Sequence, residues 1–172
     1  ALLCAGVCIA ASGDWPTYGH DPGGMRYSPL AEITTANVSQ LKPAWVYHMR
    51  PPQPPAAAAG PGTAAPAQGR GRGRGGSGFA ASETTPLVVN GVMYITTPYG
   101  RVVALDPTTG KEVWVFQVPA GNPSTRGVEY WPGDAKVPPQ IIFGTGNGRL
   151  YSLDAKTGVP TETFGDKGSL DM

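Results

Sequence analysis

An eleven-residue segment occurs twice in this chain, and the second copy begins 48 positions after the first. Residues 100–110 read GRVVALDPTTG, and residues 148–158 read GRLYSLDAKTG. An apolar stretch precedes each copy in the same register, VMYI at 92–95 and QIIF at 140–143. Two apolar segments separated by a Gly-Arg turn predict a β-hairpin. A fixed period of this size is typical of a repeat architecture.

The turn that follows each hairpin contains residues suited to tight backbone geometry. Asp106 can accept hydrogen bonds from N–H groups of the turn, and Gly110 can supply the positive φ that ends it. We therefore interpret Asp106 and its repeat partner Asp154 as structural residues and not as a catalytic carboxylate pair. Trp114 and Phe116 follow on one side of the next strand. We expect them to pack against a neighbouring sheet.

The repeat predicts an all-β fold, and its period favours a β-propeller, in which blades of four antiparallel strands recur every 40–50 residues or so. Residues 42–47 (KPAWVY) resemble residues 111–116 (KEVWVF), which suggests an earlier outer strand. About two blades fit into this length. Because a propeller needs several blades to close, we expect the chain to be an N-terminal fragment of a larger protein.

The chain divides into four predicted segments. Residues 1–11 are small and apolar and look like the end of a signal peptide, which predicts export to the periplasm. Residues 12–50 form an N-terminal segment with the first outer strand. Residues 51–78, rich in Pro, Ala, Gly and Arg, lack apolar periodicity and predict a disordered insertion. Residues 79–172 contain the 48-residue repeat.

The charge and cysteine content exclude several classes of function. The net charge of +1 gives no reason to expect nucleic acid as a partner. The two cysteines, Cys4 and Cys8, both fall in the predicted signal peptide, so the mature domain carries no thiol ligand. His20 and His48 are the only histidines, and their spacing does not form a metal pair. The sequence itself therefore indicates no metal ligands.

Three further segments of the chain read DWPTYGHDPGGMRYSPL at 14–30, ETTPLVVNGVMY at 83–94 and RGVEYW at 126–131. Taken together and in this order, they resemble the quinoprotein dehydrogenases. The resemblance implies an eight-bladed propeller in the intact protein, with pyrroloquinoline quinone (PQQ) and a calcium ion on its axis. It also implies oxidation of a sugar or an alcohol by hydride transfer to the quinone, with electrons passed to a membrane quinone or cytochrome.

Within this family, FGTGNGRL at 143–150 looks most like the glucose dehydrogenase branch. The methanol dehydrogenase branch carries an adjacent cysteine pair shortly before its Arg-Gly motif. Residues 121–125 (GNPST) occupy that stretch here, which argues against a methanol dehydrogenase.

The resemblance assigns two cofactor-binding residues within this chain, Glu83 and Arg126. Arg126 matches the arginine that contacts the cofactor, and a guanidinium suits the carboxylates of PQQ. Glu83 matches a glutamate that hydrogen-bonds the edge of the cofactor. The family's catalytic base and calcium ligands come from later blades, so no catalytic residue is assigned here.

Two other interpretations stay open at the level of sequence. The same repeats build non-enzymatic propellers, such as scaffolds for outer-membrane protein assembly, which have no need of residues 14–30 or of Glu83 and Arg126. A complete chain of this length would form a small β-module with open sheet edges and unburied aromatic side chains. The glucose or alcohol dehydrogenase is the interpretation that uses all of these segments.

Overall fold

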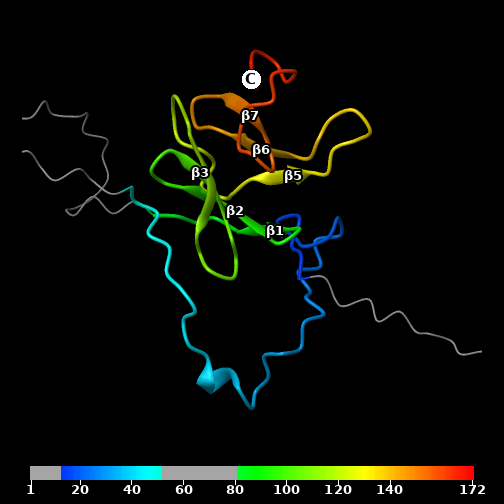
Figure 1. Ribbon diagram of the computed structural model, residues 1–172, viewed down its shortest axis with the longest axis vertical. Helices are drawn as coiled ribbons and strands as arrows, with labels where there is room; N and C mark the ends of the chain where they lie inside the picture. The colour runs from blue at the N-terminus through cyan, green and yellow to red at the C-terminus, as the bar shows by residue number, and fades with distance from the viewer. Residues whose placement is uncertain (1–12, 52–80) are drawn as a thin grey trace, which may run out of the picture.

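The structure is a computed structural model that describes residues 13–51 and 81–172. Within those ranges it consists of strands and loops, apart from one short 3-10 helix, η1 (Val38–Gln40). Two four-stranded antiparallel sheets lie one against the other (Figure 1). The first sheet contains β1 (Leu87–Val89), β2 (Val92–Thr97), β3 (Arg101–Leu105) and β4 (Glu112–Gln117), and the second contains β5 (Glu129–Trp131), β6 (Gln140–Gly144), β7 (Arg149–Asp154) and β8 (Ser169–Asp171). The predicted all-β class is confirmed.

The sequence repeat corresponds to the central hairpin of each sheet. Met93 of β2 lies opposite Leu105 of β3, and Ile141 of β6 lies opposite Leu153 of β7, so the two hairpins share one register. Strand β3 is buried along its whole length because its two faces pack on different clusters. Val102 and Ala104 face the core between the sheets, whereas Val103 and Leu105 face the other side. The four consecutive apolar residues that follow Arg101 in β3 are consistent with this double burial.

The second repeat departs from the first after Leu153. In the first sheet Leu105 pairs with Glu112 at the start of β4. The equivalent Leu153 pairs with Pro160, but only as an isolated bridge. The chain then makes a turn around Phe164 before β8 pairs with the start of β7. The fourth strand of the second sheet, β8, therefore begins later within its repeat than β4 does in the first sheet.

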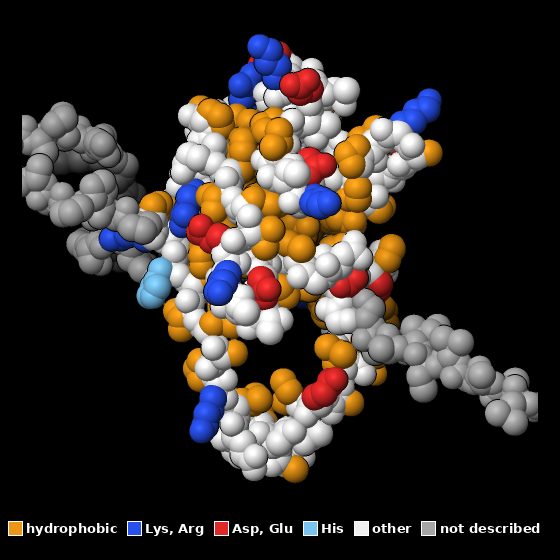
Figure 2. Space-filling model, in the orientation of Figure 1, with side chains coloured by type: hydrophobic (Ala, Val, Ile, Leu, Met, Phe, Trp, Pro, Cys, Tyr) orange, Lys and Arg blue, Asp and Glu red, His pale blue; other side chains and the backbone are white. Residues whose placement is uncertain are grey.

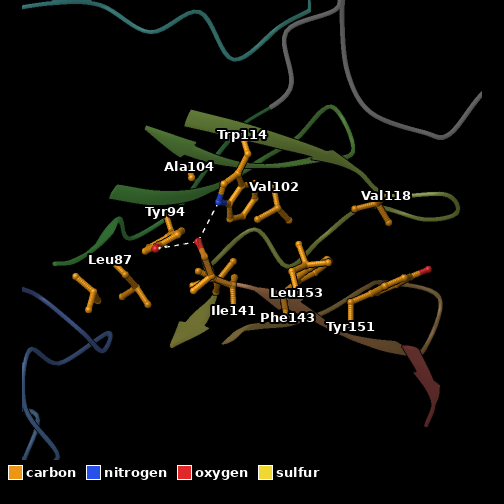
Figure 3. Packing of buried hydrophobic residues seen from close by; sticks show 13 residues of the cluster. Leu87, Tyr94, Val102, Ala104, Trp114, Val118, Ile141, Phe143, Tyr151 and Leu153 are labelled. Atoms are coloured by element: carbon orange, nitrogen blue, oxygen red, sulfur yellow. Dashed lines mark hydrogen bonds between the residues drawn. The ribbon is translucent and has the colours of Figure 1, made fainter. Parts of the chain in front are cut away.

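Trp114 is the main contact between the sheets. Its side chain is 9% exposed and extends from β4 toward the second sheet, where the indole N–H donates to the carbonyl oxygen of Ala155 at 3.0 Å (Figure 3). The hydroxyl of Tyr94 donates to the same oxygen at 3.2 Å. The indole also lies over Gly158, at the end of the Leu-Asp turn. The predicted docking of Trp114 between blades is confirmed.

Trp45 makes the same contact with the first sheet. Its indole N–H donates to the carbonyl oxygen of Pro107 at 2.9 Å, and its ring lies over Gly110. Pro107 and Gly110 are the repeat equivalents of Ala155 and Gly158. The likeness between residues 42–47 and 111–116 therefore reflects a shared docking contact.

The predicted outer strand within residues 12–50 is not formed. Residues 41–50 have an extended, irregular backbone, and η1 is the regular element of this segment in the described chain. A strand needs ladder partners, and no neighbouring strand pairs with these residues in the parts that the structure describes. The segment is held instead by side chains. The Arg101 guanidinium, for example, donates to the Met49 carbonyl oxygen and lies 3.6 Å from a carboxylate oxygen of Glu112.

After residues 14–20 the chain leaves the sheets. Residues 21–46 form an arm that extends away from both sheets (Figure 1). Apolar side chains gather along this arm on the visible face (Figure 2). Met25, Tyr27 and Val46 are each about 70% exposed or more, at 74%, 68% and 72%. The predicted signal peptide and most of the predicted insertion lie outside the described residues.

Alkaline pH is expected to destabilise the contact between the sheets through Tyr94. Burial raises the pKa of the Tyr94 hydroxyl from 10.0 to about 12. A raised pKa means that the folded protein favours the neutral phenol, so this stability is complete below pH 10 and is lost as the pH rises from 10 to 12. The expected loss is about 2 kcal/mol. Urea unfolding at pH values from 10 to 12 measures this loss of stability. The variant Tyr94→Phe has no ionisable hydroxyl at this position and should not show this part of the loss. An identical loss in both proteins would contradict it.

Candidate cofactor cleft

A cleft of about 400 Å³ opens where the first strands of the two sheets, β1 and β5, lie near each other. This volume is in the range of small-molecule sites, ~300–1,000 Å³. Most of its wall is apolar, and its charged groups are one arginine and one glutamate. The lining residues are Tyr18, Thr85, Leu87, Ser124, Arg126, Gly127, Val128, Glu129, Ile142, Phe143, Gly144 and Leu150.

The N-terminal segment forms one wall of this cleft because it pairs with the free edge of β1. The N–H of Trp15 donates to the carbonyl oxygen of Val88 at 2.6 Å, and the N–H of Val88 donates back to Trp15 at 3.0 Å. This bridge places Tyr18 against the cleft. The Arg26 guanidinium lies 4.8 Å from the centre of the Tyr18 ring, an arrangement that is favourable for a cation.

Arg126 lies in the loop before β5 and lines the cleft. Its carbonyl oxygen accepts a hydrogen bond from the N–H of Thr85 at 3.2 Å, and its own N–H donates to Ser124 Oγ at 3.2 Å. The guanidinium is exposed and has no hydrogen-bond or ion-pair partner among the residues that the structure describes. A positive charge that forms no ion pair among the described residues is therefore available at the cleft.

Glu83 lies two residues before Thr85, and its side chain is exposed. It does not line the cleft itself. The next residue, Thr84, fixes this segment to β2, because its hydroxyl lies 2.5 Å from the hydroxyl of the fully buried Thr96. The backbone bond from Thr85 to Arg126 brings the segments of Glu83 and Arg126 side by side. The two residues assigned from the sequence thus belong to one region.

The arrangement is suited to binding a planar or elongated anion. Arginine forms paired hydrogen bonds with a carboxylate, and apolar walls strengthen such a contact by excluding water. Glu129 adds one negative charge to the lining. Within residues 13–51 and 81–172, no three His, Cys, Asp or Glu side chains gather as they would around a metal ion.

Asp106 and Asp154 are structural, as predicted. Asp106 Oδ1 accepts the N–H groups of Thr108 and Thr109 at 2.8 and 2.9 Å. These bonds lower the pKa of the Asp106 carboxyl, and the bond from Thr109 has the larger effect. Asp154 Oδ1 likewise accepts the N–H groups of Lys156 and Thr157, at 3.0 and 2.8 Å. Both carboxylates serve their own turns.

Sequence reasoning did not assign Tyr18, Ser124 or Gly127 to the site, although the three residues line the cleft. Ser124 and Gly127 flank Arg126 in the motif STRG. A serine hydroxyl can accept a hydrogen bond from the backbone N–H two residues later and so form a turn. This signal could have identified Ser124, whereas the placement of Tyr18 depends on a bridge between residues 73 positions apart.

Comparison with known proteins decides the family. The β-propeller domain of the PQQ-dependent glucose/ethanol/alcohol dehydrogenases matches residues 15–172. The chain belongs to this family. The two described sheets are accordingly blades of a quinoprotein propeller, and the propeller predicted from the repeat is confirmed.

Individual relatives agree with this assignment. The chain is 35% identical to the glycerol dehydrogenase large subunit of Gluconobacter oxydans (strain 621H) over 94% of its own length and 21% of that protein. It is 30% identical to the quinoprotein glucose dehydrogenase of Escherichia coli (strain K12), over 96% of its length and 20% of that protein. The chain therefore spans about a fifth of the length of these quinoprotein relatives.

The crystal structure of quinohemoprotein alcohol dehydrogenase from Comamonas testosteroni has the same fold. It superposes with a TM-score of 0.60 at 31% identity and covers 87% of this chain, which in turn covers 19% of that protein. Relatives named for glucose, glycerol and alcohol thus resemble the chain to a similar degree. No helix in the described parts of the chain is long and apolar enough to cross a membrane.

Proposed function

We propose that this chain supplies two blades and part of the cofactor site of a PQQ-dependent dehydrogenase that oxidises a sugar or an alcohol. The observation that carries the proposal is the unpaired Arg126 guanidinium at the cleft between the blades, in a chain of this family. The share of its relatives that the chain spans supports a longer active protein. The exposed apolar side chains of the arm, among them Met25, Tyr27 and Val46, also favour further blades.

PQQ fits the residues that are present. It is a planar aromatic tricarboxylate, and the cleft offers an arginine for a carboxylate together with partly exposed apolar side chains, such as Ile142 and Leu150, for ring surface. Glu83 lies beside this region and can accept a hydrogen bond from an N–H of the cofactor. The residues present therefore fit one carboxylate and part of the ring surface of the group.

When bound, PQQ supplies the electrophilic quinone that accepts hydride from the substrate. The residues of this chain bind and orient it. Arg126 neutralises a carboxylate, and the loop that holds Arg126 is attached to both blades, which limits movement of its backbone. The apolar wall excludes water from the contact. None of the lining residues is placed as the base for the substrate hydroxyl, and we propose that the base and the calcium ligands lie on other blades.

The cellular setting follows from the same proposal. The apolar segment at residues 1–11 supports export, so we place the protein in the periplasm. The electron acceptor is then a membrane quinone or a cytochrome. Glucose and short alcohols are the two substrate classes to compare, since the similarity to glucose dehydrogenase does not exceed that to relatives acting on glycerol.

Dye-linked oxidation by the whole protein tests the proposal. The protein is reconstituted with PQQ and calcium and assayed with glucose, other aldoses, glycerol and short alcohols. We expect turnover that depends on PQQ, with one substrate class preferred. Absence of turnover, together with absence of PQQ binding in a titration, would favour a non-enzymatic propeller scaffold.

Substitution of the two assigned residues is expected to weaken PQQ binding. Arg126→Ala removes a charge-assisted contact and should lower the affinity about 30-fold, equivalent to about 2 kcal/mol. Glu83→Gln should lower it a few-fold, roughly 1 kcal/mol, because the amide is a weaker acceptor than the carboxylate. Lys136→Ala removes one positive charge outside the cleft lining and serves as the control. An unchanged affinity in Arg126→Ala would remove this arginine from the site.

A further inference from the structure

The loop that carries Arg126 is attached to its neighbours on two sides. The N–H of Ser124 donates to the carbonyl oxygen of Gly144 at 2.9 Å, at the end of β6. The carbonyl oxygen of Asn122 accepts the N–H of Gly146 at 3.1 Å. On the other side, Thr85 of the first blade donates to the carbonyl oxygen of Arg126. The loop therefore joins the two blades at the edge of the cleft.

Ser124 also forms the bond that sets the backbone of Arg126. Its Oγ accepts the Arg126 N–H at 3.2 Å, and its carbonyl oxygen accepts the Gly127 N–H at 3.4 Å. The backbone N–H of Arg126 is thus bonded to Ser124, and its carbonyl oxygen is bonded to Thr85. Its guanidinium has no partner within the described segments. A fixed backbone limits the positions that the guanidinium can reach, and its unpaired charge can bind an anion.

Gly127 permits the close approach on which this geometry depends. Its φ is +119°, and a Cβ at this position would lie 2.9 Å from the carbonyl oxygen of Thr85. Any side chain would therefore push the loop away from the first blade. Glycine at this position therefore lets Arg126 bond to Thr85 and to Ser124 Oγ at the same time.

We propose that Ser124 is a positioning residue, which holds Arg126 in the orientation that binds a carboxylate of PQQ. The inference rests on the proposed function and deepens it, because it names how the cofactor contact is prepared. Ser124 acts through Arg126 and not by its own contact with the cofactor. Its hydroxyl oxygen is engaged by the Arg126 N–H, and removing it releases the turn that presents the guanidinium.

A double-mutant cycle on PQQ affinity tests this inference. The whole protein is prepared as wild type, Ser124→Ala, Arg126→Ala and the double variant, and each apo form is titrated with PQQ in the presence of calcium. We expect Ser124→Ala to weaken binding about fivefold, the size of one hydrogen bond. In the Arg126→Ala background the same substitution should have no further effect.

Three outcomes overturn the inference, and they are distinguishable. An equal loss from Ser124→Ala in both backgrounds would mean that Ser124 contacts the cofactor directly or acts on stability alone. An unchanged affinity in Ser124→Ala, with a large loss in Arg126→Ala, would leave the proposed site intact and remove the role of Ser124. An unchanged affinity in Arg126→Ala would overturn the inference together with the proposed site.

Discussion

Replacement of Trp114 by alanine is expected to lower the free energy of unfolding by about 3–5 kcal/mol, the range for large aromatic side chains in a core. The indole is 9% exposed and fills the space between the blades, in contact with Gly158 and close to the Tyr94 ring, whose centre is 5.9 Å away. Alanine would leave a cavity there. It would also remove one of the two donors to the carbonyl oxygen of Ala155.

Urea unfolding of the whole protein, followed by intrinsic fluorescence and by circular dichroism, measures this loss. Val115→Ala is the matched control, because Val115 is adjacent on β4 and 39% exposed, and it should cost less than about 1 kcal/mol. Trp114→Phe keeps most of the volume but lacks the N–H, so an intermediate loss is expected. A loss below about 1 kcal/mol for Trp114→Ala would show that this residue does not hold the blades together.

The second large effect is expected from Gly158→Ala, at about 2–4 kcal/mol. Gly158 has a φ of +71°, which is unfavourable for a residue with a Cβ. A Cβ there would also lie 2.6 Å from two carbon atoms of the Trp114 ring. Backbone strain and overpacking therefore add at this position.

Two other glycines separate these contributions. Gly91→Ala has a φ of +74° but no atom within 4 Å of the added Cβ, so it should show the backbone strain alone, about 1–2 kcal/mol. Gly146→Ala has neither feature and should be close to neutral. Urea unfolding compares the stability of the wild type with that of the three variants. Equal losses for Gly158→Ala and Gly91→Ala would contradict the close contact between the turn and Trp114.

The local parts of the fold could be predicted from the sequence because neighbouring residues determine them. The hairpin register, the hydrogen bonds of Asp106 and the positive φ of Gly110 all depend on residues within one repeat. The docking role of Trp114 was also predictable, since an aromatic residue at a fixed place in a repeat has the same neighbour in each copy. Trp45 on Gly110 illustrates this rule in an otherwise irregular segment.

The parts that were not predictable depend on long-range contacts. Residues 42–47 resemble a strand, yet they form none here, because strand formation requires a partner that local sequence does not reveal. The cleft exists because Trp15 bridges to Val88 and Thr85 bonds to Arg126, and both contacts join distant segments. Family resemblance identified Arg126 and Glu83, but the turn made by Ser124 and Gly127 required the structure.

The docking contact and the cofactor cleft are parts of one arrangement. Trp114 and Tyr94 fix the second blade against the first through Ala155. This places β5 and its preceding loop beside the start of β1, where Thr85 can bond to Arg126. A substitution that separates the blades should therefore weaken PQQ binding as well as stability, although Trp114 does not line the cleft.

A crystal structure of the whole protein with PQQ bound would show whether Arg126 holds the cofactor. We expect a carboxylate of the cofactor within hydrogen-bond distance of the Arg126 guanidinium, with the Arg126 N–H still bonded to Ser124 Oγ. Bound PQQ with Arg126 turned toward solvent, or PQQ held at a site away from the β1 and β5 cleft, would contradict it.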